Sequence, residues 1–222
     1  MSTQPMSELL SGVIPADFKP PPVDLEAASL AYVAEARKRD AIARYELVVP
    51  TAMRESDWTH PSLVPNREQI ARVLSHQVTH KGLLLTGRTG RGKTRAMWAL
   101  LRRLACDEAR DVRYFHAQDW FSTLQSYLNF GRDDARGWVD AVARRPVIFI
   151  DDLGQEAMHT ARSEWAMSWF LRFLDIRVSE RLPLYITTNL DAQGIAERGA
   201  SSVRGDPMVR RLIDLCEPIR FI

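Results

Sequence analysis

The sequence predicts an α/β protein whose parallel sheet carries helices on both faces. From Gly82 onward, short apolar runs rich in β-branched or aromatic residues alternate with helix-like stretches, which is the pattern of such a sheet. The first apolar run leads into a glycine-rich turn that opens a helix. The chain has 222 residues, of which 45% are hydrophobic, enough for a sizeable core. These observations favour one α/β domain with an extra N-terminal arm.

The N-terminal part of the chain precedes the strand pattern. Residues 1–24 hold five prolines among polar and small residues, so we expect a flexible arm. Asp24 is placed to cap a helix that runs into a basic cluster, and residues 25–65 are expected to form this helix and a linker that faces a partner or packs on the core. Asn66 and Gln69 are spaced as a capping pair for a helix through about Val78. The core is therefore expected to span residues 66–222.

At least five strands are expected in this core, with helices in the gaps between them. The apolar runs predict strands at Leu83–Thr86, Val112–His116, Val147–Ile150, Leu184–Thr187 and near Pro218–Ile222. The stretches between them predict helices, notably at Thr94–Ala105 and Ser163–Val178.

The turn after the first strand matches the phosphate-binding pattern G-x-x-x-x-G-K-[ST] at every fixed position. Its glycines allow successive backbone N–H groups to point inward, and the following helix adds the positive end of its dipole, so phosphate is the natural ligand. The Lys93 ammonium would reach the β- and γ-phosphates, and the Thr94 hydroxyl would be a ligand of Mg²⁺. The motif consists of Gly87, Arg88, Thr89, Gly90, Arg91, Gly92, Lys93 and Thr94.

Two carboxylates follow the third expected strand. Asp151 would hold Mg²⁺, directly or through water, as a buried strand that leads into a metal site should allow. Asp152 would orient or deprotonate the attacking water, because carboxylates adjacent along an extended backbone point in different directions. A pair of aspartates at a strand end is often a turn signal, but after a phosphate loop the functional interpretation is favoured.

Asn189 ends the fourth expected strand. In P-loop ATPases with an additional strand, that strand lies between the other two, and Asn189 would then face the water that attacks the γ-phosphate. An Asn after a strand is commonly a turn former, so this role depends on the order of the three motifs along the chain.

Composition excludes several classes of protein. The longest apolar runs, such as residues 146–150, are far too short to cross a membrane, and the N-terminus has no signal pattern, so we expect a soluble, cytoplasmic protein with no membrane partner. Cys106 and Cys216 stand alone, which indicates neither a zinc site nor a disulfide framework. The net charge of +2, from 30 basic and 28 acidic residues, demands no nucleic-acid partner, so any contact with DNA is local.

Two further patterns carry less weight. His76 and His80 lie four apart on an expected helix, but a third zinc ligand is missing and we interpret both as surface residues. The segment from Trp120 to Arg136 mixes aromatic and basic residues that could stack on single-stranded DNA and neutralise its phosphates, although packing of the tyrosine and a solvated basic face explain it somewhat better. The residues concerned are Tyr127, Phe130, Arg132 and Arg136.

With these motifs in view, residues 45–222 resemble the DnaC and IstB group of AAA+ ATPases, which includes helicase loaders and transposition helpers. The resemblance rests on the phosphate loop, on residues 150–156 (I-D-D-L-G-Q-E) and on residues 186–190 (I-T-T-N-L). Residues 174–177 (L-D-I-R) resemble a helix of the group that ends in D-x-R, and residues 209–212 (V-R-R-L) resemble the element that carries its arginine finger.

The resemblance implies a three-layer AAA+ fold that binds and hydrolyses ATP with Mg²⁺. Because the sequence stops soon after the last expected strand, little or no C-terminal helical lid is expected. It also implies a homo-oligomer in which Arg211 of one subunit reaches the ATP of its neighbour, with Arg210 as the rival finger. A solvated basic pair is an equally good explanation of the two arginines.

Several functions remain open for such an ATPase. The leading hypothesis is a DnaC-type loader that delivers a replicative helicase to single-stranded DNA. An IstB-like transposition helper that coats double-stranded DNA is the main alternative. A small-molecule kinase that uses the same loop, or an adaptor that binds ATP without hydrolysing it, would be of a different class.

Overall fold

The computed structural model describes residues 24–54, 60–154, 163–190, 194 and 202–222. The contacts divide the chain into two units, Met1–Ala36 and Arg37–Ile222. The expected Pro-rich arm lies outside the described residues, apart from Asp24. Where the structure describes the chain, no helix is long and apolar enough to cross a membrane.

Helix α2, Leu25–Val48, begins in the first unit and ends in the second. The Asp24 carboxylate accepts hydrogen bonds from the backbone N–H groups of Glu26 and Ala27, at 3.1 and 3.0 Å. These bonds satisfy two of the N–H groups that a helix start leaves without partners. The predicted cap is thereby confirmed.

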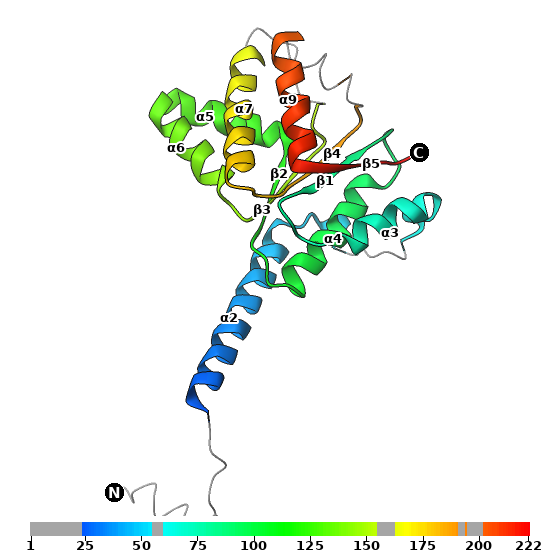
Figure 1. The fold of residues 1–222 in the computed structure, drawn as a ribbon, viewed down its shortest axis with the longest axis vertical. Helices are drawn as coiled ribbons and strands as arrows, with labels where there is room; N and C mark the ends of the chain where they lie inside the picture. The colour runs from blue at the N-terminus through cyan, green and yellow to red at the C-terminus, as the bar shows by residue number, and fades with distance from the viewer. Residues whose placement is uncertain (1–23, 55–59, 155–162, 191–193, 195–201) are drawn as a thin grey trace, which may run out of the picture. The chain divides into compact units, whose positions relative to one another are not determined.

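The second unit is built on a sheet of five parallel strands (Figure 1). They are β1 (Gly82–Thr86), β2 (Val112–His116), β3 (Val147–Asp151), β4 (Leu184–Thr188) and β5 (Cys216–Arg220), in the spatial order β2-β3-β4-β1-β5. Each expected strand is present, and its observed bounds lie close to the predicted ones. Strand β4 lies between β1 and β3, as expected for a P-loop ATPase with an additional strand.

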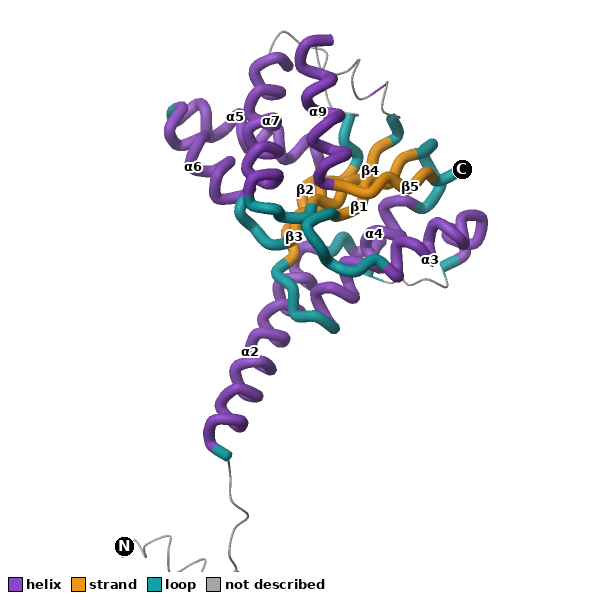
Figure 2. The backbone as a smooth tube through the Cα atoms, viewed as in Figure 1, coloured by secondary structure: helices purple, strands orange, loops and turns teal. Residues whose placement is uncertain are grey.

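Helices cover both faces of this sheet (Figure 2). The chain moves in one direction from β1 to β2 and in the other from β2 through β3 and β4 to β5. Because parallel crossovers are right-handed, the reversal places α4 on one face and the later helices on the other. The remaining helices are α3 (Arg67–Ser75), α4 (Lys93–Cys106), α5 (Ala117–Phe130), α6 (Arg132–Ala143), α7 (Ser163–Ser179) and α9 (Ser202–Leu215), with short 3-10 turns at Thr51–Met53 and Pro61–Asn66.

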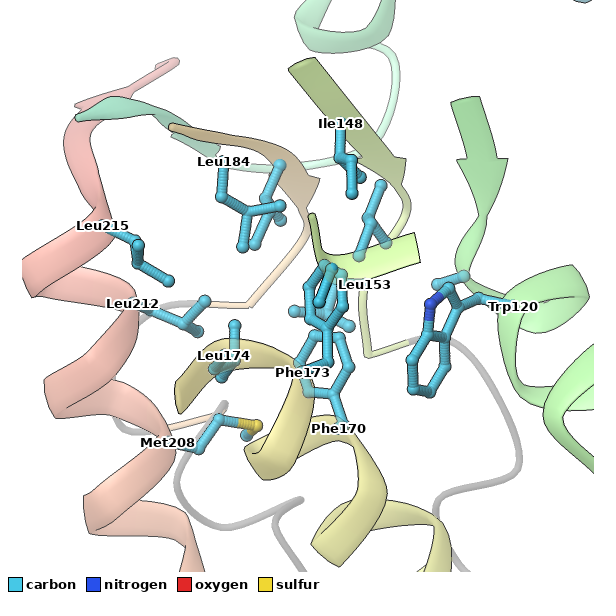
Figure 3. Packing of buried hydrophobic residues seen from close by; sticks show 14 of the residues in the cluster. Trp120, Ile148, Leu153, Phe170, Phe173, Leu174, Leu184, Met208, Leu212 and Leu215 are labelled. Carbon is cyan, nitrogen blue, oxygen red and sulfur yellow. The ribbon is translucent and has the colours of Figure 1, made fainter. Parts of the chain in front are cut away.

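Successive side chains of each strand point to opposite faces of the sheet, so the buried residues form two hydrophobic clusters, one on each face. Leu84, Ile148 and Ile186 pack with α5, α6, α7 and α9, around Trp120 and the two rings of Phe170 and Phe173 (Figure 3). Side chains of opposite parity, such as Leu83, Phe149 and Tyr185, pack with α3, α4 and the end of α2. The three-layer α/β fold is therefore confirmed.

The second cluster includes side chains from the expected linker. Tyr45 is only 5% exposed and meets Trp98 edge-on, with ring centroids 5.9 Å apart. Ala41, Val49 and Leu63 are also buried. Segments within the range 25–65 thus share the hydrophobic core of the α/β fold, while the domain boundary at residue 65 stays a prediction.

A buried arginine ties together the starts of two strands. Arg177 of α7 is fully buried and donates to the carbonyl oxygens of Ala143 at 2.8 Å, Arg145 at 2.9 Å and Pro183. Burial lowers the pKa of its guanidinium to about 10, so it stays charged at neutral pH. The backbones that enter β3 and β4 are held by one side chain.

Helix α3 corrects three predictions. The helix stops at Ser75 rather than near Val78, so His76 and His80 do not share a helix face. Asn66 lies at the start of α3 but makes no capping hydrogen bond with its side chain, which is turned to a tertiary contact described below. His76 is half-buried, with its ring edge against Tyr185, rather than a surface residue.

Candidate nucleotide-binding site

Three polar segments meet at the carboxyl edge of the sheet because β1, β4 and β3 are neighbours there. The phosphate loop follows β1, the two aspartates end β3, and Asn189 follows β4. Ligands of open parallel sheets bind at this edge. The site residues predicted from separate motifs are therefore brought together.

The loop approaches the neighbouring strand closely at its first glycine. Gly87 has φ 134°, and a Cβ there would lie 2.2 Å from the carbonyl oxygen of Phe221. Only glycine fits both the backbone conformation and the space. The loop is thereby seated against the chain just beyond β5.

Lys93 points back into the loop. It is 5% exposed, and its ammonium donates to the carbonyl oxygens of Gly87 at 2.7 Å and Arg88 at 3.0 Å and to the Asn189 side-chain oxygen at 2.7 Å. Burial lowers the pKa of Lys93, against the opposing effect of Asp152 and Asp151. The first motif and the third are therefore linked by a direct hydrogen bond.

Asp151 lies opposite the start of α4. Its carboxylate accepts hydrogen bonds from the hydroxyl of Thr94, at 2.9 Å, and from the hydroxyl of Thr187. Burial raises the pKa of Asp151, and these two hydrogen bonds oppose the shift. The two residues predicted to hold a metal are adjacent.

Asp152 leaves the strand in a different way from the prediction. Its φ of 58° is left-handed, so it begins a turn and does not continue the extended strand. Its backbone N–H donates to the Thr187 hydroxyl at 2.9 Å, and its carboxylate accepts from the Asn189 amide at 3.4 Å. The two carboxylates diverge because of this turn rather than because of strand alternation.

A cavity of about 240 Å³ opens over these groups. Its lining includes the loop from Thr89 to Arg95, together with Asp152, Asn189 and Met53. Phosphate-bearing ligands suit this lining, since it combines backbone N–H groups at a helix start with a buried ammonium.

The residues around Asp151 fit a magnesium ion. Mg²⁺ is commonly held by one or two protein oxygens together with substrate phosphates and water, and the Thr94 hydroxyl and the Asp151 carboxylate supply two such oxygens. Within the described parts of the chain, no group of three or more His, Cys, Asp or Glu residues could hold a metal. A metal here would take its remaining ligands from phosphate and water.

The two arginines of α9 differ in their surroundings. The Arg211 guanidinium pairs with the Asp175 carboxylate of α7 and donates to the Pro207 carbonyl oxygen at 3.1 Å. Arg210 is exposed. The contacts of Arg211 thus lie within α7 and α9 and do not reach the residues around Lys93.

The sequence interpretation missed three positioning residues. Thr187 and Thr188 are fully buried in β4; the first bonds to both aspartates, and the second donates to the Leu153 carbonyl oxygen at 2.6 Å. Two adjacent hydroxyls in an otherwise apolar strand were the available signal. Asn66 is 1% exposed, donates to the Arg91 carbonyl oxygen at 3.2 Å and accepts from the Ile222 N–H at 3.0 Å. No local pattern indicates that contact.

The aromatic and basic segment spans α5 and α6. Tyr127 is 38% exposed and stacks on Trp138, with centroids 5.6 Å apart. Phe130, Arg132 and Arg136 are exposed. The tyrosine therefore packs on its own domain, in agreement with the simpler interpretation, and contact of this surface with DNA stays a prediction.

Comparison with known proteins gives a family. The family model for IstB-like ATP binding proteins matches residues 30–219. Among curated proteins, no significant match was found.

Several solved structures share the fold. A structure of DnaI has a TM-score of 0.61 at 22% identity, over 79% of this chain and 95% of that one. The DnaC helicase loader has a TM-score of 0.57 at 22% identity, over 78% of this chain and all (100%) of that one. A putative primosome component from Streptococcus pyogenes serotype M3 has a TM-score of 0.55 at 20% identity, over 79% and 90%. At these identities, the likeness is one of fold.

The family match covers most of the chain, and it includes the phosphate loop and the β3 and β4 motifs. Of the functions left open above, it favours an ATPase over a small-molecule kinase or a non-hydrolysing adaptor. The chain belongs to the IstB-like ATP binding protein family and is an ATPase with a P-loop AAA+ fold.

Proposed function

We propose that this ATPase is a helicase loader, which uses ATP binding and hydrolysis to deliver a replicative helicase to single-stranded DNA. The observation that carries the ATP-dependent part is the network that joins Lys93, Asn189 and Asp152, with Asp151 and Thr94 beside it. The helicase partner is supported by the likeness of fold to DnaI and to the DnaC helicase loader.

In this proposal the loop amides and Lys93 hold the β- and γ-phosphates of ATP. Thr94 and Asp151 hold Mg²⁺, which when bound neutralises charge on the phosphates. Asp152 accepts the proton of the attacking water, and the amide of Asn189 holds the Asp152 carboxylate in place. Asn189 hydrogen-bonds to both Lys93 and Asp152. A movement of Lys93 on binding or loss of the γ-phosphate can therefore shift the Asp152 carboxylate through Asn189.

Arg211 is proposed to act on the ATP of a neighbouring subunit. Both members of its ion pair are partly exposed, Arg211 at 30% and Asp175 at 53%, and exposed ion pairs contribute only about 0–1 kcal/mol. Arg211 would therefore lose little free energy if it left Asp175 and paired with a phosphate group of the neighbouring ATP instead. Arg210, which is exposed on the same helix, remains the rival.

A loading assay tests the proposal. The full chain, ATP, a candidate replicative helicase and a single-stranded DNA coated with single-strand binding protein are combined, and helicase bound to DNA is measured. We expect loading that depends on ATP and is lost with Lys93→Ala, while Lys81→Ala loads normally. If helicase reaches the DNA equally well without the chain, the loader function is wrong.

The second candidate is an IstB-like transposition helper, favoured by the family description itself. Such a protein should coat long duplex DNA in the presence of ATP and without a helicase. Electron microscopy and footprinting on duplex DNA separate the two functions: extended coating favours the helper, and its absence favours the loader.

A further inference from the structure

Asn66 is a buried amide whose two partners are far away in the chain. It lies directly before α3 and is 1% exposed. Its side-chain NH₂ group donates to the Arg91 carbonyl oxygen at 3.2 Å, and its side-chain oxygen accepts from the Ile222 N–H at 3.0 Å, 25 and 156 positions away. A buried amide is costly unless it is hydrogen-bonded, so both bonds are needed to satisfy it. Together they connect the phosphate loop to the chain beyond β5.

The first half of the phosphate loop is held by other contacts. The Lys93 ammonium bonds to the carbonyl oxygens of Gly87 and Arg88. Gly87 also lies so close to the Phe221 carbonyl oxygen that a Cβ at this position would clash with it. These contacts fix the loop as far as Arg88.

The second half of the loop has more backbone freedom. Gly90 and Gly92 both have left-handed φ angles, 79° and 85°, and a Cβ at Gly90 would meet nothing within 4 Å. Glycine loses more conformational freedom on ordering than other residues do. Arg91, between the two glycines, is exposed, and its carbonyl oxygen accepts the hydrogen bond from Asn66. Asn66 therefore holds the loop where its own backbone restrains it least.

The other partner of Asn66 is fixed to the sheet. Strand β5 pairs with β1 as far as Arg220, which lies opposite Thr86. The pairing continues one residue further, because the Phe221 N–H donates to the Thr86 carbonyl oxygen at 2.8 Å, and Phe221 is buried. The N–H of Ile222 comes next and is therefore held close to the sheet. Through Asn66, the second half of the loop is held to the sheet as well.

Few side chains can make this link. It requires one donor and one acceptor on a short side chain, and the amide of asparagine supplies both. An ionised aspartate would accept from Ile222 but would place a negative charge against the Arg91 carbonyl oxygen, and leucine would make neither bond. The two distant partners thus explain why asparagine stands here, although its side chain caps no helix.

The order of the loop before nucleotide arrives affects how tightly nucleotide binds. A loop that is already ordered loses less conformational entropy on binding. In the site proposed above, the loop N–H groups contact phosphates in the ground state and in the transition state alike, and an interaction of that kind changes affinity without changing kcat. We propose that Asn66 is a positioning residue, which holds the second half of the phosphate loop to the end of β5 and so sets the affinity for nucleotide. The proposal rests on this nucleotide site and not on helicase loading.

The test uses variants of the full chain. Asn66→Leu removes both hydrogen bonds at a similar side-chain size. Ile222→Pro removes only the N–H that anchors Asn66, and Ile222→Ala is its matched control, because it keeps that N–H and shortens an exposed side chain. Val139→Ala, in the buried cluster around α6, lowers stability away from the loop. Affinities for Mg²⁺-ADP and for a non-hydrolysable ATP analogue, kcat at saturating ATP and Tm are measured for each.

We expect Asn66→Leu to bind both nucleotides about tenfold more weakly, with kcat changed by less than about twofold, because a hydrogen bond that orders the loop is lost. Ile222→Pro should weaken binding in the same direction. Combined with Asn66→Leu it should add nothing further, since both substitutions break the same link. Ile222→Ala should bind normally, and Val139→Ala should lower Tm at unchanged affinity.

Unchanged affinities in Asn66→Leu would overturn the proposal. An equal loss of affinity in Val139→Ala would also overturn it, because the effect would then be one of general stability. Normal binding by Ile222→Pro, or equal losses in Ile222→Pro and Ile222→Ala, would show that the Ile222 N–H is not the anchor. A fall in kcat at unchanged affinity would assign Asn66 to the chemical step instead. Weak nucleotide binding by the wild-type protein would show separately that the nucleotide site itself is wrong.

Discussion

At the scale of single residues, the two aspartates at the end of β3 have different surroundings despite their adjacency. Asp151 is 6% exposed and bonds to two threonine hydroxyls, whereas Asp152 lines the cavity and contacts Asn189. A buried carboxylate beside a hydroxyl suits a metal, and a carboxylate that lines the ligand cavity suits a base. Their proposed roles can be separated by substitution.

Asp152→Asn is expected to retain binding of ATP and Mg²⁺ and to lower kcat by about 10²-fold or more, because the amide keeps the shape and loses the base. Asp151→Asn is expected to raise the Mg²⁺ concentration needed for half-maximal hydrolysis. Nucleotide affinity and turnover measured over a magnesium titration check both. Identical behaviour of the two variants would contradict the division of roles.

His76 gives a prediction for pH. Burial lowers its pKa below the ordinary value of about 6.5, so the unfolded chain takes up the proton first as the pH falls. Ionisation of His76 therefore does not affect the free energy of unfolding above about pH 6.5. Below that pH it lowers the free energy of unfolding progressively. His76→Phe, which keeps a ring edge against Tyr185, should lose less stability between pH 7.5 and pH 5.5 than wild type.

Thermal unfolding at the two pH values measures this difference, and His80→Gln is the matched control because His80 is exposed. For a domain of this size, about 1 kcal/mol corresponds to a change of about 2–4 °C in Tm. A pH dependence in His76→Phe as steep as that of wild type would show that other groups cause it.

At the scale of elements, α9 contacts α7 through Arg211, whose partners within the described chain do not include the residues around Lys93. The Arg211–Asp175 pair joins the two helices, and Arg210 is exposed on α9. A group that acts on a neighbouring subunit needs such a position at a helix surface. The same geometry also explains a purely structural pair, so a functional test is required.

Arg211→Ala is expected to leave ATP affinity near normal and to lower hydrolysis by about 10³-fold or more, because an arginine finger stabilises charge in the transition state. Mixing Arg211→Ala with Lys93→Ala subunits should restore part of the activity, since some interfaces then join an intact ATP site to an intact finger. Steady-state hydrolysis of the mixture measures this rescue. Rescue of Arg210→Ala instead would identify that residue as the finger.

At the scale of the whole molecule, the division between Ala36 and Arg37 suggests where the chain can be shortened. Ala41 and Tyr45 are 4% and 5% exposed, and Arg44 lies 3.4 Å from Asp111. Helix α2 therefore contributes to the ATPase core from about residue 41 onward. Residues before that point are proposed to serve the partner.

Deletion of residues 1–36 is expected to leave Tm and ATP affinity unchanged and to abolish capture of the partner helicase. Deletion of residues 1–44 should also bind ATP but lower Tm by several degrees, because Ala41 and the Arg44–Asp111 contact are lost. Calorimetry and a pull-down with the two truncated chains check this. Full helicase capture without residues 1–36 would move the interface into the ATPase core.

Local sequence signals were enough to predict the strands, the helices between them and the phosphate loop. Apolar runs of five residues between polar segments identify β1 to β4 closely, and the spacing of glycines with Lys93 and Thr94 identifies the loop, because both signals are local. The pairing of Asp151 with Thr94 could also be anticipated, since the carboxyl ends of parallel strands meet at one edge.

The contacts that hold these parts together could be seen only in the folded protein. Asn66 lies next to the helix that it was expected to cap, yet its partners, Arg91 and Ile222, are 25 and 156 positions away in the chain. The hydrogen bond from the Asp152 N–H to Thr187, the pairing of Arg211 with Asp175 and the gathering of Arg88, Arg91 and Arg220 around one cavity likewise join residues that are far apart in the chain. The physical reason is that local propensity acts through neighbouring residues, whereas a buried polar group takes whichever partner the packed fold brings within reach.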